Sequence, residues 1–174
     1  MQVDIIYTAS LDGTAKTLTI VSILFSIIGV FVCVRALRIA GKDLLTKIIY
    51  SSVLIILIGV FLVSYLYHPS KYILGNFDIA ISRPIGDITI HVPDILEIRA
   101  IKETELEGTT RVFGDGGLFG YFGHYHSPNL GDMQWYATNK NNLVIIRTKQ
   151  GDAFVISPDN KDFIGWILAK KADL

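Results

Sequence analysis

Two histidines separated by one residue are the clearest candidates for chemistry in this chain of 174 residues. In an extended strand, His124 and His126 would lie on the same face and could begin a metal site. Such a site needs a third and usually a fourth ligand. His68, His91 and Asp132 are available, but nothing in the sequence places them beside the pair. We therefore predict that the chain holds no metal ion.

Three alternating glutamates are the other candidates. Glu103, Glu105 and Glu107 would share one face of an extended segment, but Lys102 and Arg111 lie nearby. Paired-acid catalysis needs one carboxyl group whose pKa is shifted by burial, and this charged segment is typical of a solvated edge. Neither a nucleophile elbow nor an H-E-x-x-H motif is present. The sequence predicts no catalytic residue and no cofactor, and therefore a protein that is not an enzyme.

A glycine-rich block spans residues 111–123. It contains neither G-x-x-x-x-G-K-[ST] nor a G-x-G-x-x-G that opens a helix, which argues against a phosphate-binding loop. One interpretation is that its glycines are structural and mark sharp bends or close backbone approaches; they are Gly114, Gly116, Gly117, Gly120 and Gly123. The other is a binding rim of aromatic rings at one end of a barrel, made by Phe119, Tyr121, Phe122, Tyr125 and Trp135.

The elements that must position these residues begin with two apolar runs, Leu18–Val34 and Ile48–Leu66. Both lack charged residues and match the roughly 17–25 residues with which a helix crosses about 30 Å of hydrocarbon. The first run does not follow a basic segment, as a cleaved signal peptide would. We therefore predict a hairpin of two transmembrane helices at about residues 17–36 and 47–67. Gly29 and Gly59 either mark the crossing of these helices or are ordinary membrane glycines.

Charge around the hairpin predicts its orientation. The connection Arg35–Lys47 carries four basic residues against Asp43, whereas the flanking segments are balanced or acidic. Short basic loops remain cytoplasmic, so both termini are expected on the other side of the membrane. The segment after the hairpin has 11 Lys and Arg against 13 Asp and Glu, which does not favour nucleic-acid binding.

Short alternating runs separated by turn residues follow the hairpin and predict an antiparallel β domain at residues 68–174, after an N-terminal tail and hairpin at residues 1–67. The expected strands are 77–82, 87–91, 95–101, 133–138, 143–148 and 153–157. An apolar stripe that begins at Phe163 predicts a terminal helix. The single cysteine, Cys33, excludes a disulfide within the chain.

Four stretches then resemble a known family. The glycine block is followed by Tyr136–Asn139, Asn142–Thr148 and Phe154–Pro158, and segments similar to these occur in the same order in bacterial pleckstrin-homology (PH)-like proteins. The resemblance implies a bent, partly open antiparallel barrel of about seven strands with a C-terminal helix. Together with the predicted hairpin, the PH-like segment favours a membrane-anchored binding or assembly module of the bacterial cell membrane, whose partner is a protein or a second copy. Phosphoinositide binding is not expected, because Arg83 in the turn 82–87 is offset by Asp87. The alternative is an accessory or scaffold subunit of a membrane transport or envelope complex in which the hairpin is the working part.

Overall fold

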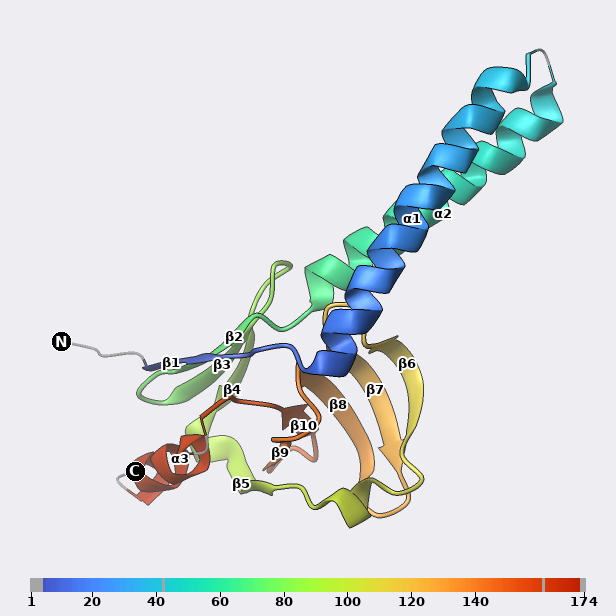
Figure 1. The fold of residues 1–174 in the computed structure, drawn as a ribbon. Coiled ribbons are helices and arrows are strands. Elements are labelled where there is room, and N and C mark those ends of the chain that lie inside the picture. Colours follow the sequence, from blue (N-terminus) through green and yellow to red (C-terminus); the bar gives the residue numbers. More distant parts are fainter. Residues whose placement is uncertain (1–4, 42, 161, 173–174) are drawn as a thin grey trace.

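A long helical hairpin stands on a β domain in the computed structural model, which describes residues 5–41, 43–160 and 162–172 (Figure 1). Helix α1 covers Gly13–Ile39 and α2 covers Leu44–Tyr67. Both are long and apolar enough to cross a membrane, and only 11% and 6% of their most apolar stretches are buried, which does not fit the core helices of a soluble protein. Asp4 and Lys42, which contributed to the predicted charge asymmetry, lie outside the described residues, as do the predicted domain ends at residues 1–4 and 173–174.

The β domain consists of two sheets. The first has the order β1-β2-β3-β4 and the second β5-β9-β10-β8-β7-β6. The strands of the first sheet are β1 (Ile5–Thr8), β2 (Lys71–Leu74), β3 (Asp78–Ser82) and β4 (Ile88–His91). Those of the second are β5 (Ile95–Ala100), β6 (Thr110–Gly116), β7 (Tyr121–Ser127), β8 (Gly131–Ala137), β9 (Val144–Thr148) and β10 (Ala153–Ile156). Two short 3₁₀ turns, Val92–Asp94 and Glu103–Leu106, flank β5.

This architecture contains the predicted elements in the predicted order, a membrane-type hairpin followed by a mostly-β domain with a C-terminal helix. The barrel is not closed, since β5 and β6 end the second sheet. Two details differ from the prediction. Within the described residues nine strands follow the hairpin instead of about seven, and β8 pairs with β10 in parallel.

The segment before the hairpin is part of the β domain. Ile5–Thr8 pairs antiparallel with β2, and Tyr7 packs edge-on against Phe163 with ring centroids 5.0 Å apart. The predicted separation into residues 1–67 and 68–174 therefore places this strand on the wrong side of the boundary. Ile5–Thr8 shows no alternation of apolar and polar residues, so its sequence did not indicate a strand, and only pairing with β2 makes it one.

Helix α3 (Phe163–Ala172) closes the core between the two sheets. Phe163 and Ile167 are fully buried on its inner face, as its apolar stripe predicted. At its last turn, Lys170 donates to the carbonyl oxygen of Gly75 at 2.5 Å and Lys171 to that of Ile95 at 2.7 Å. The helix is therefore tied to both sheets.

Candidate functional site

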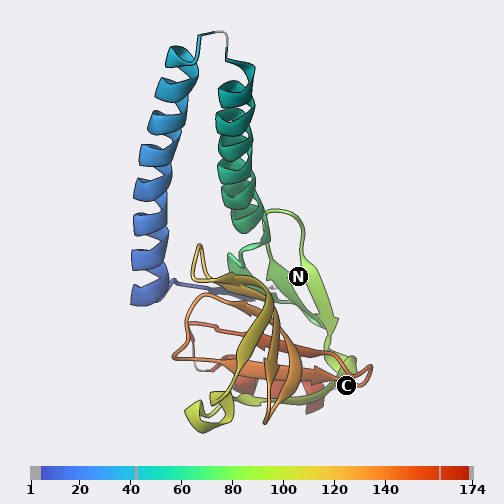
Figure 2. The same cartoon turned by 90° about the vertical axis from the view of Figure 1, so that its right-hand side faces the viewer.

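The turn between β6 and β7, residues 117–120, reaches between the domain-proximal ends of α1 and α2 (Figure 2). The Thr19 hydroxyl of α1 donates to the Gly117 carbonyl oxygen at 3.3 Å and accepts from the Phe119 N–H at 3.0 Å. From α2, the Ser64 hydroxyl donates to Asp115 Oδ2 at 2.8 Å. Each helix therefore contributes one buried hydroxyl group that holds the turn.

Asp115 organises this turn. Its Oδ1 accepts from the backbone N–H groups of Gly117 at 3.0 Å and Leu118 at 2.8 Å, while Oδ2 binds Ser64. Hydrogen bonds to an ionised acceptor are stronger than those between neutral groups. The carboxylate thus fixes the turn and joins it to α2 at the same point.

Phe119 lies against α2. It is the only described non-glycine residue with a positive φ, +60°, a backbone conformation that side chains rarely adopt. Its ring packs edge-on against Phe61 and Tyr65, with centroids 6.3 and 6.0 Å away. It also forms one wall of an apolar cavity of about 580 Å³ between the helices. Gly29 lies where α1 approaches α2, since a Cβ there would meet Leu57 at 3.3 Å, whereas a Cβ on Gly59 would meet nothing.

Most of the predicted aromatic rim is buried. Tyr121, Tyr125 and Trp135 are 1%, 8% and 3% exposed and belong to a core cluster beneath α1. The expectation that these rings are presented at an open end is therefore wrong for them. The alternation of residues along β7 does not tell which face of the strand is buried. In the structure, the start of α1 covers the face on which these rings lie.

Tyr121 instead anchors the beginning of α1. Its hydroxyl donates to both carboxylate oxygens of Asp12 at 3.2 and 3.3 Å, and Asp12 caps α1 by accepting from the Ala15 N–H at 2.7 Å. Burial and the negative charge of Asp12 raise the pKa of Tyr121 to about 12. Tyr121 is therefore a neutral hydrogen-bond donor that joins the hairpin to the β domain.

The glycines of the block leave little room for side chains. Gly114 and Gly123 face each other across β6 and β7 with φ values of +116° and +121°. A Cβ on either one would overlap the carbonyl oxygen of the opposite strand. A Cβ on Gly117 would overlap Leu18 of α1, and one on Gly120 would lie 2.9 Å from the Ala137 carbonyl oxygen. Only glycine fits the close approach of these strands. The fifth, Gly116, lies under the Arg111 guanidinium.

A groove of about 910 Å³ runs between α2 and the two strands, and we call it the α2 groove. Its helix wall consists of Ile56, Gly59, Val60, Val63, Ser64 and Tyr67. Its other wall comes from β6, β7 and Tyr136 of β8, and includes Phe122, the fourth predicted rim residue. Phe122 is only 6% exposed, so it contributes to the floor of the groove and not to a protruding rim.

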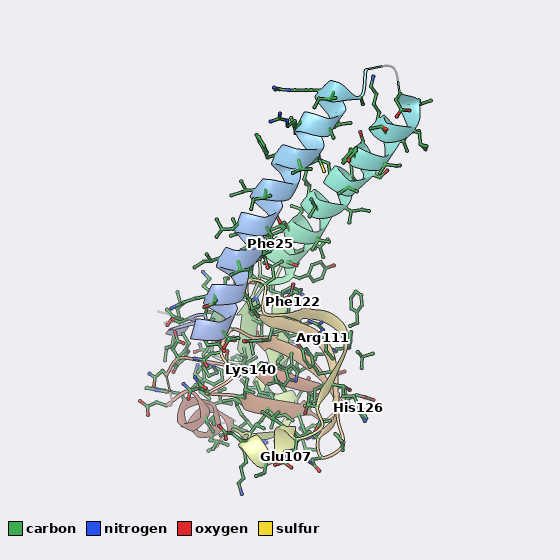
Figure 3. All side chains as sticks on the ribbon, turned by 45° about the vertical axis from the view of Figure 1, so that its right-hand side comes forward. Phe25, Glu107, Arg111, Phe122, His126 and Lys140 are labelled. Carbon is green, nitrogen blue, oxygen red and sulfur yellow. The ribbon has the colours of Figure 1, made fainter. Side chains whose placement is uncertain are left out.

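The charged groups of the α2 groove lie on its domain side. Arg111 and His124 line it, and Figure 3 places Arg111 and Phe122 toward the hairpin, with Glu107 at the far end of the domain. Arg83 lies at the Tyr67 end, with its guanidinium carbon 5.7 Å from the Tyr67 ring centroid and 5.4 Å from that of Tyr136. Within the described residues, neither arginine forms a salt bridge with a carboxylate.

β6 is an unpaired edge with exposed apolar side chains. Among the described residues it pairs only with β7, and the register shifts between Arg111 and Phe113, which makes Val112 the extra residue of a β-bulge. Val112 and Phe113 are 69% and 74% exposed. β6 was not predicted as a strand, because its glycines obscure the alternation of apolar and polar residues.

The histidine pair and the glutamates with candidate chemistry lie on β7 and in or next to a 3₁₀ turn. His124 and His126 are both exposed on β7, and His126 Nδ1 lies 2.7 Å from Asp132 Oδ1. No group of three potential metal ligands occurs among the described residues. Glu103 and Glu105 lie in a 3₁₀ turn, where Glu105 accepts two hydrogen bonds from Arg99 at 2.7 and 2.8 Å. Hydrogen bonds from Arg99 and from the Lys102 N–H lower the pKa of Glu105 to about 2, so this carboxyl group is an ion-pair partner.

The hydroxyl residues that join the hairpin to the domain were not singled out from the sequence. Thr19 and Ser64 resemble ordinary small polar residues of a membrane helix. Their position, each within one or two turns of the domain-proximal end of its helix, is the only signal that could have identified them.

Comparison with known proteins gives one finding. The family model described as bacterial PH domain matches residues 70–167, which is more than half of the chain. No curated protein and no solved structure matches the chain. The matched region begins just before β2 and ends within α3, so it excludes β1 and both long helices.

Proposed function

The chain belongs to the bacterial PH domain family, and from this premise we propose that it is a membrane-anchored binding or assembly module that is not an enzyme. PH domains are generally non-catalytic binding modules. The two apolar helices fit a membrane location for this one. The proposed partner is a protein, or a second copy of the chain, close to the bilayer.

The observation that carries the proposal is the open edge of β6. On the side away from β7 its backbone N–H and C=O groups meet no partner strand in the part of the chain that the structure describes, and Val112 and Phe113 expose apolar side chains beside them. An extended segment that adds to such an edge gains main-chain hydrogen bonds, and pockets for its side chains provide specificity. Soluble proteins usually protect an edge of this kind with charge.

The hairpin supports this role by restricting the domain to a thin layer. The turn between β6 and β7 is held by Thr19 and Ser64, so the open edge lies beside the membrane end of the domain. A partner in the same layer meets the edge at a raised effective concentration. We propose the bacterial cell membrane as the location. The basic connection at residues 35–47 favours an extracytoplasmic β domain. Protease cleavage of the β domain in cells whose outer envelope alone is permeabilised supports that side, and protection until the inner membrane is broken contradicts it.

The test compares two edge strands of one sheet. Leu96 is an exposed bulge residue of β5, the opposite edge, and so provides a matched control for Val112. A photo-crosslinking amino acid at Phe113 should capture one defined partner in cells, whereas the same probe at Leu96 should not. Val112→Lys should abolish the cross-link by placing charge on the edge, and Leu96→Lys should leave it intact. Equal cross-linking from both positions, or a cross-link that survives Val112→Lys, contradicts the proposal.

A second candidate function rests on the cavity of about 580 Å³ between the helices, whose lining includes Ile27, Leu57 and Phe61. In this alternative the hairpin itself scaffolds a membrane transport or envelope complex. Replacing both spans by unrelated apolar sequence, while keeping Thr19 and Ser64 so that the β domain remains docked, separates the two functions. Retained function favours the β domain, and lost function with a docked domain favours the hairpin.

A further inference from the structure

The α2 groove lies directly beside the open edge of β6. Residues 110–114 of this strand are all exposed, and residues 111–115 line the groove opposite α2. A segment that pairs with β6 therefore borders the groove. The two walls of the groove then determine which side chains such a segment can carry.

The helix wall of the groove reaches well into the apolar run of α2. It extends from Ile56 to Tyr67, which is about 16 Å along a helix that rises about 1.5 Å per residue, or roughly half the thickness of the hydrocarbon layer. Gly59 lies on this wall, and a Cβ there would meet no atom within 4 Å. Small residues let a second helix approach closely within a membrane. The wall therefore suits another transmembrane helix.

The domain wall of the groove carries positive charge. The Arg111 guanidinium extends along β6 to Gly116, which brings its charge toward the hairpin end of the strand. Arg83 lies where α2 ends, and neither arginine forms a salt bridge within the described residues. Among the described residues that line the groove, Asp115 is the only carboxylate, and its oxygens already accept from Ser64 and two backbone N–H groups. A carboxylate from outside the chain would complement this wall.

A second copy of the chain does not supply that carboxylate at the β6 edge. The only acidic residue of β6 is Asp115, whose oxygens are already occupied. Pairing of two β6 edges would also place both Arg111 side chains in one short interface, where like charges repel. Charge complementarity therefore favours a different protein.

We propose that the partner at the β6 edge is another integral membrane protein, which binds through an acidic segment next to its transmembrane helix. In this arrangement, which rests on the proposed function, that helix packs on α2 at Gly59. The extended segment beside it pairs with β6 and places a carboxylate at Arg111. Main-chain hydrogen bonds along β6 supply affinity, and the pair between arginine and carboxylate selects the sequence.

The test uses the full chain in phosphatidylcholine nanodiscs, with a photo-crosslinking amino acid at Phe113. The probes are synthetic single-span peptides whose apolar helix continues into a short segment of alternating threonine and valine, with glutamate, glutamine or lysine at its centre. We expect the glutamate peptide to cross-link at a concentration about tenfold lower than the glutamine peptide, which is the gain from one charge-assisted hydrogen bond. The lysine peptide should bind most weakly.

Charge reversal at Arg111 gives the sharpest comparison. Arg111→Glu should invert the order of the peptides, and Arg111→Lys should retain it. Lys149→Glu changes the net charge of the chain equally at an exposed position outside the groove, and should leave the order unchanged. Gly59→Phe should weaken all three peptides, whereas Val53→Phe, at an exposed position of α2 that lines neither the groove nor the cavity between the helices, should not.

The outcomes distinguish a failure of this inference from a failure of the proposed function. Equal cross-linking of the three peptides, an order that Arg111→Glu leaves unchanged, or full binding by Gly59→Phe overturns the inference while the edge still binds. A cross-link to a second copy or to lipid in place of the glutamate peptide also overturns it. If no peptide cross-links although the probe at Phe113 captures a partner in cells, the inference fails and the proposed function stands. If the cellular cross-link is absent as well, both fail.

Discussion

Removing the Ser64 hydroxyl tests whether the turn between β6 and β7 holds the β domain on the hairpin. Ser64 is 5% exposed and donates at 2.8 Å to Asp115, so Ser64→Ala deletes one bond between α2 and the domain. Alanine is a good helix former, so α2 itself should be unaffected. Ser52→Ala, the same change at an exposed position of α2, is the control.

The free-energy cost of each variant follows from the hydrogen bonds that remain in it. A hydrogen bond to a charged group contributes about 1.5–3 kcal/mol, and Ser64→Ala should lie near 1.5 because the carboxylate keeps its two N–H donors. That loss corresponds to about a tenfold increase in the undocked population. Asp115→Ala removes all three bonds and should cost about 3 kcal/mol or more. Because the two residues share one bond, the double variant should be no less stable than Asp115→Ala.

Distance measurements between two nitroxide labels report docking directly. Val53 on α2 and Lys149 after β9 are exposed positions for the labels, and Cys33→Ser removes the only native cysteine. The wild type should give a narrow distance distribution by double electron–electron resonance. Ser64→Ala should add a broad component that grows further in Asp115→Ala.

Two outcomes would refute this reasoning. Identical distributions in Ser64→Ala, Asp115→Ala and the Ser52→Ala control would show that the turn does not hold the domain. Additive effects in the double variant would show that Ser64 and Asp115 act separately.

Three further predictions concern the stability of the β domain, measured by urea denaturation of the full chain in micelles. Gly123→Ala should lower the free energy of unfolding by more than about 2 kcal/mol, because its Cβ overlaps the facing strand. Gly151 has φ +96° but open space around it, so Gly151→Ala should cost only about 1–2 kcal/mol of backbone strain. Equal losses of stability in the two variants would contradict the overlap. Pairing with Arg99 lowers the folded-state pKa of Glu105 to about 2, below its ordinary value of about 4.3. The pair therefore stabilises the fold at pH values above about 4.3, and this stabilisation is lost as the pH falls toward 2. Glu105→Gln should therefore be less stable at pH 7 and lose less stability between pH 5 and pH 2, and an unchanged acid profile would contradict this. Ser157→Ala removes the hydroxyl oxygen that accepts from the backbone N–H groups of Thr138 at 2.8 Å and Asn139 at 3.1 Å. It should lower the free energy of unfolding by about 2–4 kcal/mol. A denaturation midpoint equal to that of the wild type would contradict this prediction.

Local pattern was sufficient for the elements that interact mainly with solvent or lipid. The hairpin could be predicted because an uncharged run of this length reflects one requirement, that every residue of the span be compatible with hydrocarbon. The strands β3, β4, β5, β8, β9 and β10 were each anticipated from alternation and turn residues, and α3 from its apolar stripe. These signals depend on residues close together in the sequence.

The tertiary structure alone decided which segments pair with each other and which side chains they cover. Strand β1 exists because Ile5–Thr8 meets β2 across more than sixty residues of chain, a pairing that no local pattern encodes. Tyr121 and Trp135 are buried because the start of α1 covers them, while Val112 and Phe113 remain exposed because β6 ends the sheet. The sequence determined that this chain has a membrane-type hairpin, a β domain and a constrained glycine block. Which aromatic rings face a partner depends on contacts between distant segments, and composition and spacing carry no information about those contacts.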